Sequence, residues 1–136
     1  MRRYIAAGLL FMALSLPALA QDSRQAGIEE VIRGQLDAFR TEDLDRAFGY
    51  AAPGIQDIFR TPGNFGLMVQ NGYPMVWRSR DAELLALEER DGRLWQRVRM
   101  RGPNGATHLL DYEMIEGPEG WRIGAVVRIP SPDIAV

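Results

Sequence analysis

Turn signals divide the second half of the chain into short segments, and their spacing constrains the fold more than any other feature of the sequence. Asp91-Gly92 is a two-residue hairpin signal, and the string Gly-Pro-x-Gly occurs at 102–105 and again at 117–120. The segments between the turns have the lengths and residue types of strands, at about 74–79, 82–91, 94–101, 106–116 and 121–129. Because such short loops can join only antiparallel neighbours, the pattern predicts an antiparallel meander.

Alternation within these segments predicts which side chains face the core. In 94–101 the predicted inward set is even-numbered: Leu94, Gln96, Val98 and Met100. In 121–129 it is odd-numbered: Trp121, Ile123, Ala125, Val127 and Ile129. In 106–116 two sets compete: His108, Leu110, Tyr112 and Met114 against Leu109, Asp111, Glu113 and Ile115. Since two loops of identical geometry cannot satisfy both parities, we expect that one loop differs or that one strand carries a β-bulge.

The first half of the chain has helical periodicity. An amphipathic helix is expected over 22–40, where apolar residues recur at helical spacing: Ile28, Val31, Ile32, Leu36 and Phe39. A shorter helix is expected over 42–51, with one further turn at 55–59, and Thr61-Pro62 starts a third helix over 62–71. Helices followed by an antiparallel sheet predict an α+β fold, with the helices on one face of the sheet.

Residues 1–20 have the layout of a cleavable secretory signal peptide. Arg2 and Arg3 precede an apolar run over 5–16, and Ala18 and Ala20 form the small-residue end. As a helix, that run spans about 18 Å, which is shorter than the roughly 30 Å hydrocarbon core of a bilayer. We therefore expect cleavage after Ala20, a single domain over 21–136, a periplasmic or secreted location and no membrane insertion after cleavage.

Composition excludes several classes of function. The formal net charge is −2 and no basic stripe is present, so nucleic acid is not an expected partner. The chain has no cysteine and one histidine, His108, which excludes a disulfide framework and zinc or copper sites of the usual ligand types. The sequence therefore predicts no metal, no cofactor and no assigned catalytic residue.

Several strings are similar to a bacterial family known only as a domain of unknown function within the nuclear-transport-factor-2-like superfamily. They are Ala51-Ala52-Pro53-Gly54-Ile55-Gln56, Met68-Val69 followed by Gly72-Tyr73-Pro74, and isolated matches at Phe65, Gln96, Tyr112 and Trp121-Arg122-Ile123. This resemblance implies three helices over a strongly curved antiparallel sheet that encloses a conical cavity, the cystatin-like cone. It implies no activity, because the superfamily includes isomerases, dehydratases, cyclases and non-catalytic modules.

The resemblance and the helical stripe of 62–71 together predict a mostly apolar cavity between that helix and the sheet. Its predicted ligand-binding wall is Phe65, Met68, Tyr73, Trp77 and Tyr112. The alternative is that these side chains interdigitate into a filled core. An open cavity would suit a small hydrophobic or amphipathic ligand.

Two other functions compete with ligand binding. A proton-transfer or hydrolytic enzyme needs a carboxylate beside a tyrosine or histidine inside the cavity, and the available residues are Asp57, Tyr50, Tyr73, His108, Asp111 and Tyr112. The simpler interpretation of Asp111 and Glu113 is cross-strand ion pairing with Arg97 and Arg99. A structural homodimer is the third hypothesis, with Trp95 predicted on the outer face of the sheet.

Overall fold

The computed structural model describes the backbone of residues 16–130 and the side chains of residues 23–130. Its elements are α1 (Leu16–Arg40), α2 (Leu44–Gly49), α3 (Pro53–Phe59), α4 (Pro62–Gly72), α5 (Pro74–Trp77), β1 (Arg80–Arg90), β2 (Arg93–Arg101), β3 (Thr107–Gly117) and β4 (Gly120–Ile129). The strands form one antiparallel sheet in the order β1-β2-β3-β4. The predicted α+β class and the meander are therefore confirmed.

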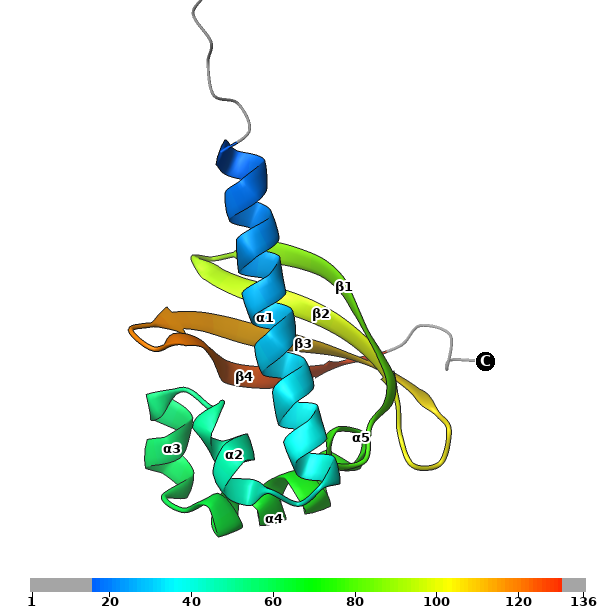
Figure 1. The fold of residues 1–136 in the computed structure, drawn as a ribbon. Helices are drawn as coiled ribbons and strands as arrows, with labels where there is room; N and C mark the ends of the chain where they lie inside the picture. The colour runs from blue at the N-terminus through cyan, green and yellow to red at the C-terminus, as the bar shows by residue number, and fades with distance from the viewer. Residues whose placement is uncertain (1–15, 131–136) are drawn as a thin grey trace, which may run out of the picture.

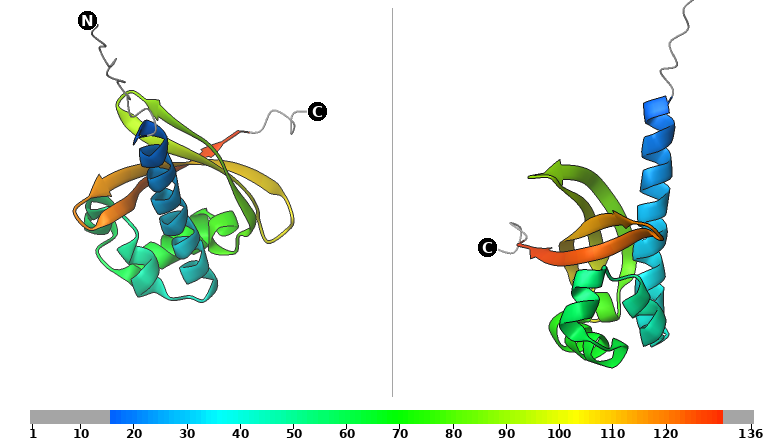
Figure 2. Two further views of the ribbon diagram at one scale, coloured as in Figure 1. Left: turned by 45° about the horizontal axis from the view of Figure 1, so that its top comes forward. Right: turned by 90° about the vertical axis from the view of Figure 1, so that its left-hand side faces the viewer.

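The helices cover one face of the sheet. The long helix α1 crosses that face, and α2, α3 and α4 gather beside β4 at the C-terminal end of α1 (Figure 1). Figure 2 shows the strands curving and twisting as they pass behind α1. The predicted apolar stripe of α1 is buried in this layer: Ile28, Val31, Ile32, Leu36 and Phe39.

Local capping explains where the shorter helices begin. The side chain of Asp43 accepts a hydrogen bond from the Arg46 amide at 3.3 Å and caps α2, which is shorter than the predicted 42–51. The Thr61 hydroxyl accepts from the Asn64 amide at 3.1 Å and caps α4, as the Thr61-Pro62 pair predicts. Pro53 starts α3, which is the expected extra turn.

The prediction of a strand at 74–79 is wrong. Pro74 occupies the first turn of a one-turn helix, α5, in which the Val76 amide donates to the Tyr73 carbonyl oxygen at 2.8 Å. Met75 and Val76 are both buried, so they satisfy the apolar pattern without joining the sheet. Residues 16–130 therefore contain four strands, and five helices where the resemblance implies three.

The structure explains why the inward-facing residues are even-numbered in β2 and β3 and odd-numbered at the start of β4. Gln96, Val98 and Met100 are fully buried on β2, and Leu110, Tyr112 and Met114 are the inner set of β3. The loop between Arg101 and Thr107 has five residues, whereas the loop between Gly117 and Gly120 has two, so the two loops do differ. A bulge at Gly124 then reverses the parity of β4.

The bulge corrects the inner set that was predicted for β4. Ile123 is buried opposite Met114, as predicted, but beyond the bulge it is Val126 that pairs with the inner residue Tyr112. Val127 is therefore on the outer face and 46% exposed, contrary to the prediction. A Cβ on Gly124 would lie 2.5 Å from Cδ1 of Ile115, so any larger residue at the bulge requires the end of that exposed side chain to move.

The N-terminal prediction is only partly covered by the structure. Residues 1–15 of the predicted signal peptide lie outside the described residues, and residues 16–20 form the start of α1, which begins earlier than the expected residue 22. Among the helices of residues 16–130, none combines the length and the apolar character needed to cross a bilayer.

Candidate functional site, an apolar pocket beside β4

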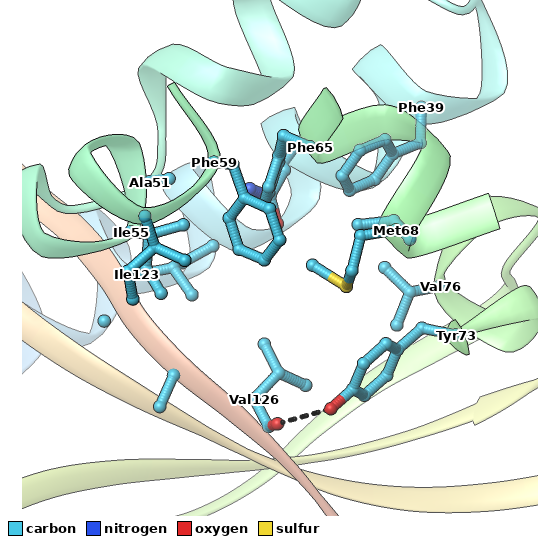
Figure 3. A pocket seen from close by; sticks show the side chains of 15 residues that line it. Phe39, Ala51, Ile55, Phe59, Phe65, Met68, Tyr73, Val76, Ile123 and Val126 are labelled. Atoms are coloured by element: carbon cyan, nitrogen blue, oxygen red, sulfur yellow. Dashed lines mark hydrogen bonds between the residues drawn. The ribbon is translucent and has the colours of Figure 1, made fainter. Parts of the chain in front are cut away.

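A pocket of about 340 Å³ opens between α3, α4 and β4 (Figure 3). Its wall comes from α1, α3, α4, α5, β4 and the segments between them: Gln35, Phe39, Ala51, Ile55, Ile58, Phe59, Phe65, Met68, Val69, Tyr73, Val76, Ile123, Gly124, Ala125 and Val126. Only Gln35 and Tyr73 bring polar side chains to this wall. The lining includes no aspartate, glutamate, histidine, lysine or arginine.

Helical spacing places the apolar wall on the helix side of the pocket. On α4, Phe65, Met68 and Val69 stand at positions i, i+3 and i+4 and so share one face. Phe65 is held by three aromatic neighbours, with ring centroids 5.4 to 5.8 Å away: Phe39, Phe48 and Phe59. Because its ring is packed against these three rings, the Phe65 side chain has a fixed position in the pocket wall.

Beta strand β4 forms the opposite wall through its free edge. The segment before α3 pairs with β4 at one point, where Ile123 exchanges hydrogen bonds with Tyr50 and Ala52 at 2.9 and 2.8 Å. Further along the strand the Tyr73 hydroxyl donates to the Val126 carbonyl oxygen at 3.2 Å, as Figure 3 shows. That bond shows that the polar backbone of Val126 faces away from β3 and toward the pocket.

A second polar side chain fixes the α1 side of the wall. Gln35 is 3% exposed, and its Nε2 donates to the Ala47 carbonyl oxygen at 3.1 Å. This bond ties α1 to α2 at the edge of the pocket.

One residue of the pocket wall is an exposed apolar side chain, and another wall residue, Tyr73, has a cation from outside the lining stacked on its ring. Ile58 on α3 lines the pocket and is 69% exposed. The guanidinium carbon of Arg128 lies 4.8 Å from the centroid of the Tyr73 ring, which is within range of a cation–π interaction. The interior of the pocket is therefore apolar, and a positive charge lies on the ring of one of its wall residues.

Three of the five residues predicted to bind ligand line this pocket: Phe65, Met68 and Tyr73. Trp77 lies outside it, against Phe39 at 5.7 Å and under the Arg78 guanidinium at 4.8 Å. Trp77 falls within the strand expected at 74–79, and the helix α5 replaces that strand. Whether the lining residues bind a ligand stays a prediction.

Tyr112 also lies outside the pocket, in the interior of the fold. Its side chain is fully buried on β3, and among the described residues its hydroxyl has no hydrogen-bond partner. Burial raises the pKa of this phenol above its ordinary value. It is a core residue with an unsatisfied polar atom.

The pocket also contains residues that the sequence analysis did not select. Ile55, Ile58 and Phe59 repeat the i, i+3, i+4 spacing on α3, and this periodicity is visible in the sequence. No pattern in the sequence marks Val126 as a pocket residue, because the bulge at Gly124 changes which residues of β4 face inward.

The residues considered for proton transfer do not meet in the pocket. Asp111 lies on the outer face of the sheet, where its carboxylate accepts from Arg97 at 2.9 and 3.0 Å and from Arg90 at 2.6 Å. The predicted pairing of Asp111 with Arg97 is confirmed. The hydrogen bonds from Arg97 and then from Arg90 outweigh the effect of burial and lower the pKa of Asp111. A carboxylate held in this way is a poor proton carrier.

The other candidates are scattered. Asp57 is exposed on α3, and His108 lies against Gly102 at the base of the 102–106 loop. Arg99 pairs with Glu83 on β1 instead of with Glu113, whose nearest cation is Arg93 at 3.6 Å. Within the described part of the chain, no group of three or more potential metal ligands of the histidine, cysteine and carboxylate types comes together.

Comparison with known proteins defines the family of the chain but gives no function. Neither curated proteins nor solved structures give a match. One family model matches residues 21–136, which is most of the chain. The protein therefore belongs to the family described as domain of unknown function DUF4864.

Proposed function

We propose that this protein is a non-catalytic module that binds a small hydrophobic or amphipathic molecule in the pocket between α3, α4 and β4. One observation carries the proposal: the pocket of about 340 Å³ has walls that are apolar except for Gln35 and Tyr73. Its size is near the lower end of the roughly 300–1,000 Å³ that is usual for ligand sites. The absence of titratable side chains from the lining, Tyr73 apart, favours binding over proton transfer.

The proposal includes a fold family and a location. Helices packed on a curved antiparallel meander, with a pocket between them, support membership of the nuclear-transport-factor-2-like superfamily and its cone. The family match begins at Gln21, the residue at which the mature chain is expected to start. This boundary supports cleavage after Ala20 and a periplasmic or secreted single domain over 21–136.

The experiment is a fluorescence titration of the mature protein with the neutral apolar probe N-phenyl-1-naphthylamine. Met68→Trp places a larger side chain in the pocket and should weaken probe binding at least about tenfold. Leu67→Trp is the matched control, because Leu67 is on the same helix, 58% exposed and outside the pocket lining. It should bind as the wild type does. Equal binding by both variants, or no binding by the wild type, would refute the proposal.

Homodimerisation through the outer face of the sheet is a second candidate function. Trp95, Val127 and Ile129 border one hollow on that face, and Val127 is 46% exposed. Exposed apolar side chains beside an aromatic residue are typical of interface centres. Sedimentation velocity should show a dimer that Val127→Glu dissociates, and a monomeric wild type at high micromolar concentration would contradict this candidate.

A further inference from the structure

We propose, on the basis of the proposed ligand-binding function, that the pocket selects an amphiphile with one anionic head group of the carboxylate type. The head group would lie at the edge of β4 beside Arg128, and the apolar tail would lie among the side chains of α3 and α4. This assigns a ligand class and a head-group site to the pocket.

The first argument is charge. The lining itself carries no formal charge, so a charged group beside the wall meets no opposing charge among the lining residues. Arg128 stacks on the ring of Tyr73, a residue of the pocket wall, at 4.8 Å. None of the ion pairs among the described residues includes Arg128, whereas Arg90 and Arg97 on the outer face are both engaged by Asp111. Arg128 is therefore placed to meet an anion at the pocket.

The second argument is the backbone of β4. In an antiparallel pair, the N–H and C=O groups of one residue point to the same side of the strand. The Val126 carbonyl oxygen accepts from the Tyr73 hydroxyl, so the N–H of Val126 also points away from β3 and toward the pocket side. It is a donor that an acidic head group could use. The oxygen of the Tyr73 hydroxyl, which donates its proton to Val126, lies beside this donor and can accept from a polar ligand atom or a water.

The third argument concerns the tail. Figure 3 shows Phe59, Phe65 and Met68 pointing into the pocket across from Tyr73 and Val126. The lining side chains of α3 and α4 are all apolar, whereas the β4 side adds the Tyr73 hydroxyl and the Val126 backbone groups to its apolar side chains, so the two sides of the pocket differ in polarity. A volume of about 340 Å³ suits a single short chain better than a two-chain lipid.

Three probes with the same ten-carbon tail test this ligand class: decanoate, decanol and decyltrimethylammonium. Each is titrated against the mature protein by calorimetry or by displacement of N-phenyl-1-naphthylamine. Decanoate should bind at least about tenfold more tightly than decanol, because a charge-assisted hydrogen bond is substantially stronger than a neutral one. Decyltrimethylammonium should bind most weakly.

The matched variants separate the local effect of Arg128 from a change in net charge. Arg128→Gln should bring the affinity ratio of decanoate to decanol close to one. Arg99→Gln removes the same charge from the outer face, where Arg99 pairs with Glu83, and should keep the wild-type ratio. Melting temperatures of both variants check that the fold is intact.

The outcomes distinguish this inference from the function on which it rests. If the neutral probe binds and Met68→Trp blocks it, the pocket is a ligand site. In that case, equal binding of decanoate and decanol, tightest binding of the cation, or an unchanged ratio in Arg128→Gln would overturn the anionic head-group site. If the neutral probe does not bind to the wild type, the proposed function fails and the head-group inference fails with it.

Discussion

Tyr112→Phe provides the sharpest test of the packing, because the structure predicts that removing a hydroxyl will stabilise this protein. Tyr112 is fully buried, and its hydroxyl finds no partner among the described residues. Leaving such a group dry and unbonded costs about 1–3 kcal/mol, and a phenylalanine removes that cost without leaving a large void. We expect the free energy of unfolding to rise by about 1–2 kcal/mol after allowing for the lost contacts of one oxygen atom.

Tyr73→Phe is the matched control for this experiment, because the same change should have the opposite sign. The Tyr73 hydroxyl donates to the Val126 carbonyl oxygen at 3.2 Å, so its removal loses a hydrogen bond. We expect the free energy of unfolding to fall by about 0.5–1.5 kcal/mol. The two variants differ from the wild type by one oxygen atom each, so their contrast isolates hydrogen-bond satisfaction.

Urea denaturation with linear extrapolation measures both effects, and an unchanged m-value shows that the extent of unfolding is the same. Each kcal/mol corresponds to a shift in melting temperature of about 3–6 °C for a domain of this size. A loss of 1 kcal/mol or more in Tyr112→Phe would refute the reasoning. It would mean that the hydroxyl is bonded in solution, for example to a buried water.

Three further predictions concern the outer face, the bulge and the N-terminus. Asp111→Asn should reduce the free energy of unfolding by about 1–3 kcal/mol, because Arg97 and Arg90 lose a buried carboxylate. The pKa of Asp111 is lowered in the folded protein, so its stabilising effect is complete above the ordinary aspartate pKa of about 3.9 and is lost as pH falls through the folded pKa. Asp111→Asn should therefore lose less stability than the wild type when the pH is lowered. Gly124→Ala should destabilise by no more than about 1 kcal/mol, because the Ile115 Cδ1 that the new methyl group meets is the end of an exposed side chain, and the double variant with Ile115→Ala should recover that loss in chemical denaturation. Intact-mass measurement of exported protein should show a chain beginning at Gln21, and retention of residues 1–20 would contradict the predicted cleavage.

The sequence predicted those elements whose signals are local. Thr61-Pro62 caps and starts α4 through bonds that span three residues, so the helix appears where the pair predicts it. The inner set of β2 follows from alternation alone, because no bulge interrupts the pairing of Arg93–Arg101 with β3. The one-turn helix α5 was missed because an apolar run of four residues has no distinguishing period, and a strand and a helix can both bury Met75 and Val76.

The pocket was harder to predict, because periodicity shows which side chains face inward but not whether anything meets them there. Phe65 and Met68 face inward on α4 in a filled core and in an open pocket alike. What decides between the two is the opposite wall, and on β4 that wall is set by the bulge at Gly124. The parity conflict between the two loops showed that an irregularity was needed, but did not place it. Once the bulge is located, Val126 turns inward and Arg128, two residues further along the same strand, lies over Tyr73. A single extra residue in β4 therefore turns Val126 toward the pocket and Arg128 toward the ring of Tyr73.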